Sequence, residues 1–168
     1  ERSVPAFFME KSMSLEKQFE SLRAASVKLA VMNAAEKNKV LNHVADVIDA
    51  RRKEIISANE IDVANARKAG ISESVIDRLM LNDKRIDGII ESMRLVISQT
   101  DPVGEQVAGW KHPNGMSIRS VRVPLGVVAI IYENRPNVTF DVFSLAYKSG
   151  NSVLLRGSSN SYISNQKI

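Results

Sequence analysis

The feature that most constrains this sequence is a strand, helix and strand pattern in its last third. Residues 127–132 are a continuous apolar run, 139–148 have a helical pattern, and 152–156 form a second short apolar run. Continuous runs of this length predict strands that are buried on both faces, as parallel strands are. The spacing predicts one right-handed crossover of an α/β sheet, in which ligands bind at the turns after the strands.

Two parallel strands do not make a self-sufficient sheet, because such sheets need several strands with both faces covered. The sequence stops at Ile168 with no closing strand. We therefore expect the chain to be the N-terminal part of a larger protein, or to obtain its missing strands from a partner.

The region before this unit is predicted to be helical. An apolar stripe from residue 15 predicts a first helix, and Asn33 with Glu36 forms a capping box that opens a second helical stretch, which continues to Ala69. A further helix is predicted after Asn82, and Asn114-Gly115 between two short runs predicts a β-hairpin. We divide the chain into a tag or loose terminus at 1–12, a helical part at 13–104, a hairpin at 105–124 and the start of a parallel-sheet domain at 125–168.

The composition excludes several classes of protein. With 44% hydrophobic and 25% charged residues, and no apolar run near the roughly 20 residues that span a bilayer, we expect a soluble globular protein. The net charge of +4 comes from basic and acidic residues that alternate along the chain, which disfavours nucleic-acid binding. The absence of cysteine excludes a disulfide scaffold and a cysteine nucleophile within this chain, and the two distant histidines indicate no metal site.

The turns after the two predicted strands are the candidate sites. In the first, Asn137 is predicted to cap the following helix, and Arg135 supplies a positively charged fork for a phosphate or a carboxylate. The same residues also fit a proline-stiffened turn with a helix cap and a surface arginine. In the second, Arg156 is followed by small residues suited to a ribose or phosphate, although neither a dinucleotide-fold nor a P-loop pattern is present.

The order and spacing of several motifs resemble the gamma-glutamyl phosphate reductase family of the aldehyde dehydrogenase superfamily. The resemblance covers the chain from about residue 15 to its end. Its most specific part is Glu133-Asn134-Arg135-Pro136-Asn137, which separates this family from ordinary aldehyde dehydrogenases. The other segments that carry it are Asp77-Arg78-Leu79-Met80-Leu81, Asp101-Pro102-Val103-Gly104, Val123-Pro124-Leu125-Gly126, Lys148-Ser149-Gly150-Asn151 and Leu155-Arg156-Gly157.

The resemblance implies an aldehyde dehydrogenase-like α/β fold, with an N-terminal helical layer, a β-hairpin oligomerisation arm and the first βαβ unit of a Rossmann-like NADP-binding domain. It implies NADPH-dependent reduction of L-glutamyl 5-phosphate to L-glutamate 5-semialdehyde, with release of phosphate, through a cysteine thioester. A role in proline biosynthesis, a cytoplasmic homo-oligomer and a functional link to glutamate 5-kinase follow from the same resemblance, with neither nucleic acid nor membrane as a partner.

The resemblance also implies roles for single residues. The family has a second glycine where this chain has Ser158, and its cysteine nucleophile lies beyond the point where this chain stops, so the chain alone is expected to be inactive. Two alternatives are a truncated, non-catalytic oligomerisation or regulatory module of the same fold, and a general aldehyde dehydrogenase. The implied cofactor-binding residues are Arg156, Gly157, Ser158 and Ser159, the oxyanion-binding candidate is Asn134, and the substrate-binding candidates are Arg135 and Asn137.

Overall fold

The computed structural model describes residues 14–168, so the terminus predicted at 1–12 lies outside the described residues. The order along the chain is a set of helices, a hairpin, and then the strand, helix and strand unit with a short helical end. The elements are α1 (Leu15–Val31), α2 (Ala34–Ala50), α3 (Arg52–Lys68), α4 (Glu73–Leu79), α5 (Asp83–Ser98), β1 (Gln106–Lys111), β2 (Ser117–Val121), β3 (Val127–Ile131), α6 (Pro136–Lys148), β4 (Ser152–Arg156), the 3-10 turn η1 (Ser159–Ser161) and α7 (Tyr162–Lys167).

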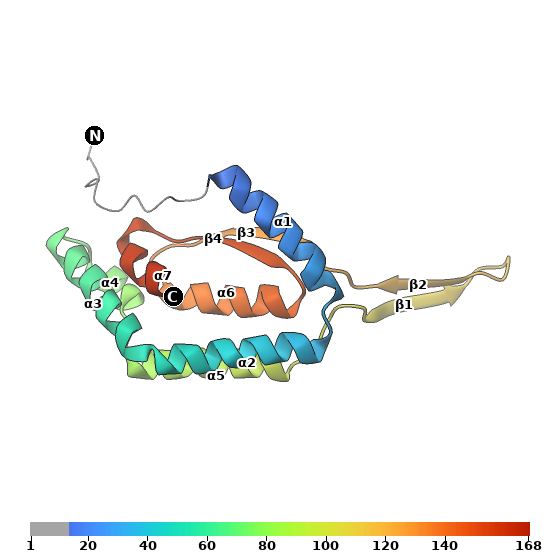
Figure 1. Cartoon of the computed structure of the whole chain (residues 1–168), viewed down its shortest axis with the longest axis horizontal. Helices are drawn as coiled ribbons and strands as arrows, with labels where there is room; N and C mark the ends of the chain where they lie inside the picture. The colour runs from blue at the N-terminus through green and yellow to red at the C-terminus, as the bar shows by residue number, and fades with distance from the viewer. Residues whose placement is uncertain (1–13) are drawn as a thin grey trace.

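The predicted crossover is present, and helices cover both sides of it. Strands β3 and β4 pair in parallel, with Val127 opposite Ser152 and Ile131 opposite Arg156. Helix α1 lies over one face of these strands and α6 over the other, while α2 and α5 pack on the far side of α6 (Figure 1). The main core lies between α2, α5 and α6 and is formed by Leu41, Ala45, Ile48, Ile55, Leu81, Ile86, Ile89, Ile90, Met93 and Phe140.

The strands are not buried on both faces, contrary to the prediction. Ile131, at the end of β3, is 84% exposed, and Ala129 is also exposed. Within the described residues β3 and β4 pair only with each other, so each strand keeps one unpaired edge. A sheet of two strands is narrow, so the flanking helices α1 and α6 do not cover it completely. Part of the apolar run of β3, which is typical of the centre of a sheet, is therefore exposed to solvent.

The helical stretch predicted from Asn33 to Ala69 is two helices rather than one. Its capping box is confirmed, because the Glu36 N–H donates to Asn33 Oδ1 at 3.0 Å and the Asn33 N–H donates to the Glu36 carboxylate at 2.9 Å. The break lies at Arg51, which ends α2 and precedes α3. The apolar pattern continues across this break, so the pattern alone did not reveal it.

Arg52 connects the junction between α2 and α3 to α5 through ion pairs. Its guanidinium donates to the carboxylates of Asp49, Asp83 and Asp87, at 2.6, 3.2 and 2.7 Å. These contacts raise the pKa of Arg52, chiefly through the hydrogen bond to Asp87. Arg52 therefore has a structural role at a helix junction.

The short helix α4 was not predicted from the sequence. Its seven residues are held by tertiary packing, because Ile76 and Leu79 are buried against Val63 and Ala66 of α3 in a second small core. Helices this short are unstable on their own, and a periodic pattern is difficult to recognise over two turns.

The hairpin around Asn114-Gly115 is confirmed, and it projects from the body of the molecule (Figure 1). Gly115 has a φ of 94°, a conformation that favours glycine. Nearly every residue of β1 and β2 is exposed, among them Val107 and Trp110. The hairpin therefore adds nothing to the core of this chain.

Two buried lysines, Lys37 in α2 and Lys148 at the C-terminal end of α6, make polar contacts with other parts of the chain. Lys37 is completely buried and pairs with Asp101 at 2.9 Å. Burial acts to raise the pKa of Asp101, but the hydrogen bonds from Lys37 and the Val103 N–H and the charges of Lys37 and Lys148 together outweigh it, so the pKa lies below its ordinary value. Lys148 donates to Asn38 Oδ1 at 2.6 Å and to the Ile97 carbonyl at 2.9 Å, and its burial lowers its pKa.

Candidate functional site

Both predicted sites lie at one end of the molecule. The carboxyl ends of β3 and β4, the beginning of α6 and the short α7 gather at the end opposite the hairpin (Figure 1). The Tyr132 N–H donates to the Arg156 carbonyl at 3.1 Å, which continues the strand pairing past the end of β3. The two turns therefore leave the sheet side by side, as expected for ligand-binding turns in an α/β crossover.

In the first turn the helix cap was predicted at the wrong residue. Helix α6 begins at Pro136 and its N-cap is Arg135, so Asn137 is the second residue of the helix and not its cap. Proline suits the first helical position because that position needs no N–H. Arg135 is exposed, whereas the side-chain oxygen of Asn134 is buried and has no hydrogen-bond partner among the described residues.

In the second turn a glycine is required by close packing. A Cβ at Gly157 would overlap the side-chain amide of Asn165 and lie 3.2 Å from the Tyr132 hydroxyl. Ser158 Oγ accepts from the Asn160 N–H at 3.2 Å and so begins the η1 turn, in which Ser159 is exposed. Arg156 is exposed, and its guanidinium makes no ion pair with any residue in the described part of the chain.

A chain of polar side chains connects the two turns, and sequence reasoning missed it. The Tyr132 and Thr139 hydroxyls lie 2.5 Å apart, and Thr139 donates to Asn165 Oδ1 at 3.4 Å. Asn165 Nδ2 in turn donates to Ser161 Oγ at 3.1 Å. The contact between Thr139 and Asn165 joins segments that are distant in the sequence, so no local motif indicates it.

Helix α3 anchors the segment that follows β4. Asp62 is buried, and its carboxylate accepts from the Ser164 N–H and hydroxyl, both at 2.7 Å. Asn59 donates to the Leu79 carbonyl and accepts from the Leu81 N–H, at 2.9 and 2.6 Å. The sequence does contain a signal for these two residues, because Asp62 and Asn59 are polar and yet lie on the apolar face of α3.

A groove of about 740 Å³ lies between α4, α5 and the beginning of α6, and we refer to it as the α5–α6 groove. It brings together the two substrate-binding candidates, Arg135 and Asn137, while Asn134 and the residues at 156–159 are not part of its lining. The structure thus divides the predicted site residues into two groups on either side of the start of α6. The residues that line this groove include Gly88 and Ser92 of α5, Arg135 just before α6, and Asn137 and Asp141 of α6.

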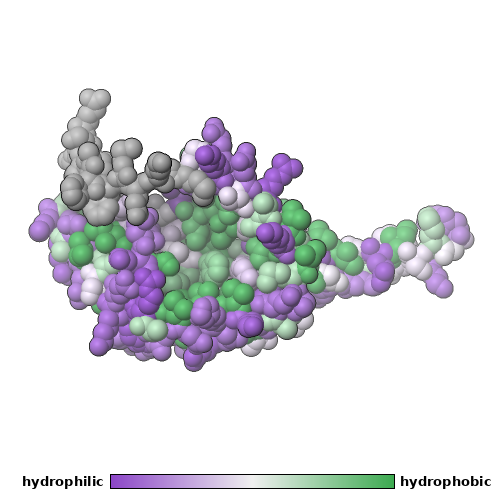
Figure 2. Space-filling view, in the orientation of Figure 1, coloured by the Kyte–Doolittle hydropathy of each residue, from purple (hydrophilic) through white to green (hydrophobic). Residues whose placement is uncertain are grey.

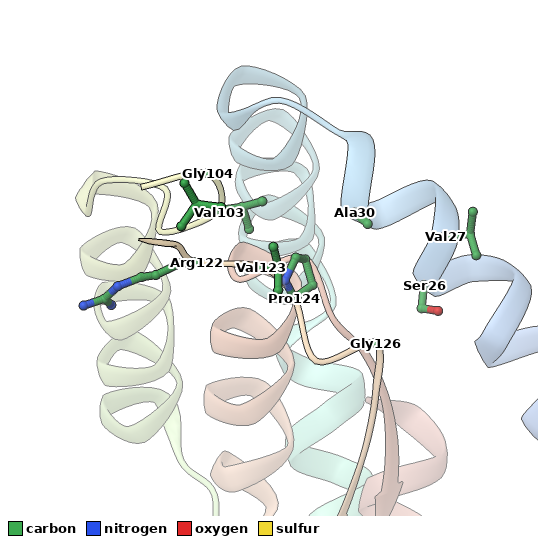
Figure 3. A pocket seen from close by; sticks show the side chains of 10 residues that line it. Ser26, Val27, Ala30, Val103, Gly104, Arg122, Val123, Pro124 and Gly126 are labelled. Atoms are coloured by element: carbon green, nitrogen blue, oxygen red, sulfur yellow. The ribbon is translucent and has the colours of Figure 1, made fainter. Parts of the chain in front are cut away.

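A second hollow, of about 460 Å³, lies at the base of the hairpin and contains none of the predicted site residues. It separates Val27 and Ala30 of α1 from Val123 and Pro124, while Arg122 points away from α1 (Figure 3). Apolar residues also gather near the centre of the molecular surface and along the arm (Figure 2). Arg122 pairs with Glu105 at 3.2 Å, so this hollow offers no unpaired charge to a ligand.

No family model matches the chain, but curated proteins and solved structures do. The gamma-glutamyl phosphate reductase of Geobacillus kaustophilus is 49% identical over 149 residues, which are 89% of this chain and 36% of that protein. The crystal structure of the gamma-glutamyl phosphate reductase of Thermotoga maritima has 47% identity and a TM-score of 0.89, over 92% of this chain and 37% of that one. The chain is a homologue of the gamma-glutamyl phosphate reductases.

The homology covers only part of those reductases. The chain spans just over a third of the length of the curated relatives, and the matched portion is N-terminal. The gamma-glutamyl phosphate reductase of Saccharomyces cerevisiae has 28% identity and a TM-score of 0.83, over 94% of this chain and 42% of that one. A probable aldehyde dehydrogenase of Listeria monocytogenes, at 18% identity and a TM-score of 0.61 over 91% of this chain and 31% of that one, shares the fold. The predicted aldehyde dehydrogenase-like fold is confirmed.

Two further observations concern the reductase homologue itself. Among residues 14–168, no group of three or more histidine, cysteine, aspartate or glutamate side chains is arranged to hold a metal ion. No helix in the described part of the chain is long and apolar enough to cross a membrane. The roles of the individual site residues remain predictions.

Proposed function

We propose that this chain is the cofactor-binding and substrate-orienting portion of an NADPH-dependent gamma-glutamyl phosphate reductase. The reaction is the reduction of L-glutamyl 5-phosphate to L-glutamate 5-semialdehyde with release of phosphate. The observation that carries the proposal is the 47–49% identity to reductases of that name over about nine-tenths of the chain. The paired turns after β3 and β4 support it, because they place two predicted sites at one end of a sheet.

In this proposal the turn after β4 contacts NADPH, which would supply the hydride when it is bound. The exposed Arg156 has no ion-pair partner among the described residues and suits a phosphate or ribose of the cofactor. Gly157 keeps the backbone close to Asn165, and Ser159 exposes a hydroxyl. Ser158 uses its oxygen to begin η1, and its O–H can still donate to a ligand.

The remaining roles are assigned to the turn after β3. We assign Asn134 to the oxyanion that forms when a cysteine thiolate attacks the acyl phosphate carbonyl and phosphate leaves, because a side-chain amide can donate to such an oxygen. The nucleophile must come from residues outside this sequence, since the chain contains no cysteine.

The exposed hairpin is proposed to join subunits of a cytoplasmic homo-oligomer that uses the product of glutamate 5-kinase.

The test is a chimaeric enzyme in which this chain replaces the matching segment of the Geobacillus kaustophilus reductase. We expect phosphate-dependent reduction of NADP by L-glutamate 5-semialdehyde, measured by the absorbance of NADPH. Arg156→Ala is expected to raise the KM for NADP about tenfold, equivalent to one charge-assisted hydrogen bond, and to leave the KM for the aldehyde unchanged. The matched control is Arg23→Ala, which removes an exposed arginine from α1.

A folded chimaera without activity would contradict the proposal. Oxidation of simple aldehydes without phosphate would favour a general aldehyde dehydrogenase instead. The intact mass of the protein in its natural source tests the non-catalytic module. A mass equal to the 18.6 kDa of this chain would support that module, and more than twice that mass would support the reductase.

A further inference from the structure

The two walls of the α5–α6 groove each present residues that lie one helical turn apart. Gly88 and Ser92 lie one turn apart on α5, and Asn137 and Asp141 lie one turn apart on α6. Ser92 Oγ donates to Asp141 Oδ1 at 3.3 Å, which ties the two walls together at one level. A Cβ at Gly88 would meet no atom within 4 Å, so this position leaves the α5 wall open.

The charged groups of the groove fall into two classes. Arg85 has a structural role, because it donates to the Asp77 carboxylate at 2.8 Å and to the Met80 carbonyl at 2.7 Å at the end of α4. Arg78 and Lys84, which also line the groove, form no ion pair with any residue in the part of the chain that the structure describes.

The same is true at the start of α6. Arg135 has no ion-pair partner among residues 14–168, and in that range the Asp141 carboxylate accepts a side-chain hydrogen bond only from the Ser92 hydroxyl. Asp141 is partly buried on the groove wall. A partly buried carboxylate without a cation is costly unless a ligand pairs with it.

We propose that the α5–α6 groove binds the α-amino acid end of the substrate, with Asp141 accepting from the ammonium group and Arg135 pairing with the α-carboxylate. This inference rests on the proposed function and names the residues that recognise its substrate. An ammonium group offers three donors to a carboxylate, and a guanidinium fork matches a carboxylate in two parallel bonds. The excess of unpaired cations in the groove suits a ligand that carries a phosphate as well as an amino acid group.

The site must distinguish L-glutamate from glutarate, which lacks the amino group. We expect L-glutamate, titrated into the isotopically labelled chain, to shift the backbone amide signals of Ser92 and Asn137. Glutarate should bind about tenfold more weakly, the difference expected from one hydrogen bond between charged groups. Asp141→Asn should weaken L-glutamate about tenfold and leave the affinity for glutarate unchanged. Asp46→Asn, at an exposed carboxylate of α2, should change neither.

Equal binding of L-glutamate and glutarate, or no binding of either, would overturn the inference. If Asp141→Asn does not fold, Arg135→Gln on the exposed turn provides the second variant. It should weaken the binding of L-glutamate and of glutarate equally, because both carry the carboxylate, and unchanged affinities would contradict the assignment.

The chimaeric enzyme separates the two proposals. An inactive chimaera with intact L-glutamate binding refutes the proposed function alone, and an active one whose KM for L-glutamate 5-semialdehyde is unchanged by Asp141→Asn refutes this inference alone.

Discussion

Lys37 is the most completely buried charge of the described chain, and Asp101 is its only ion-pair partner there. Asp101 keeps 13% of its side chain exposed, whereas Lys37 is at 0%. Removal of the aspartate therefore leaves an ammonium group with no access to water, while removal of the lysine leaves a carboxylate that water can reach. Removal of Asp101 is therefore expected to destabilise the protein more than removal of Lys37.

We expect Asp101→Asn to lower the free energy of unfolding by about 3 kcal/mol, the low end for breaking a buried ion pair. Lys37→Met should cost less, because it keeps the apolar stem and removes the buried charge. Chemical denaturation of both variants measures the difference. Glu54→Gln is the control, since the Arg51–Glu54 pair has a similar distance of 2.8 Å but is exposed, and it should remain close to wild type.

The same pair gives the stability a defined pH dependence. The folded-state pKa of Asp101 lies below its ordinary value of 3.8, so the stabilisation is fully present above that value. It is lost as the pH falls through the folded-state pKa, where the carboxyl group becomes protonated. The gap between wild type and Asp101→Asn should therefore narrow on acidification, and a constant gap would contradict this account.

Among elements, α7 is connected to α3 through the buried carboxylate of Asp62, which accepts from the Ser164 N–H and hydroxyl. We expect Asp62→Ala to speed hydrogen exchange at the Ser164 amide by more than about tenfold, because the buried acceptor of that N–H is lost. Exchange at Met93 in the main core should not change. Glu60→Ala, at an exposed neighbour on α3, is the control, and equal exchange in both variants would show that α7 is held by other contacts.

Elements with strong local patterns could be predicted from the sequence, and those that depend on tertiary contacts could not. The capping box at Asn33 and the hairpin at Gly115 are encoded by neighbouring residues, and both are confirmed. Helix α4 depends on packing against α3, and the cap of α6 was misplaced because Pro136 at its first position was given too little weight. In the candidate site, the sequence predicted Arg135 and Asn137 as substrate-binding residues; both line the α5–α6 groove, and their role stays a prediction. It could not reveal that Asp141 and Ser92 share the groove with them.

At the scale of the whole molecule, the hairpin is the segment most in need of a partner. Two-stranded hairpins are marginally stable in water, and this one exposes Val107, Trp110 and Met116. Trp110→Ser is expected to lower the average mass in sedimentation equilibrium, if the arm joins subunits as proposed. Leu95→Ser, at an exposed apolar residue of α5, provides the comparison. The same mass for both variants would contradict a subunit contact through the arm.

The unpaired edge of β3 has a further consequence for the handling of this chain. Its Val127–Ile131 segment has no charge and no proline, and its outer edge offers free backbone donors and acceptors. Segments of this kind recruit identical strands from other molecules, and natural proteins suppress that by placing charged gatekeepers beside them. Here Glu133 and Arg135 follow the segment closely, whereas the nearest charge before it is Arg122. We therefore expect Glu133 and Arg135, in the turn after β3, to limit the self-assembly of the isolated chain at high concentration.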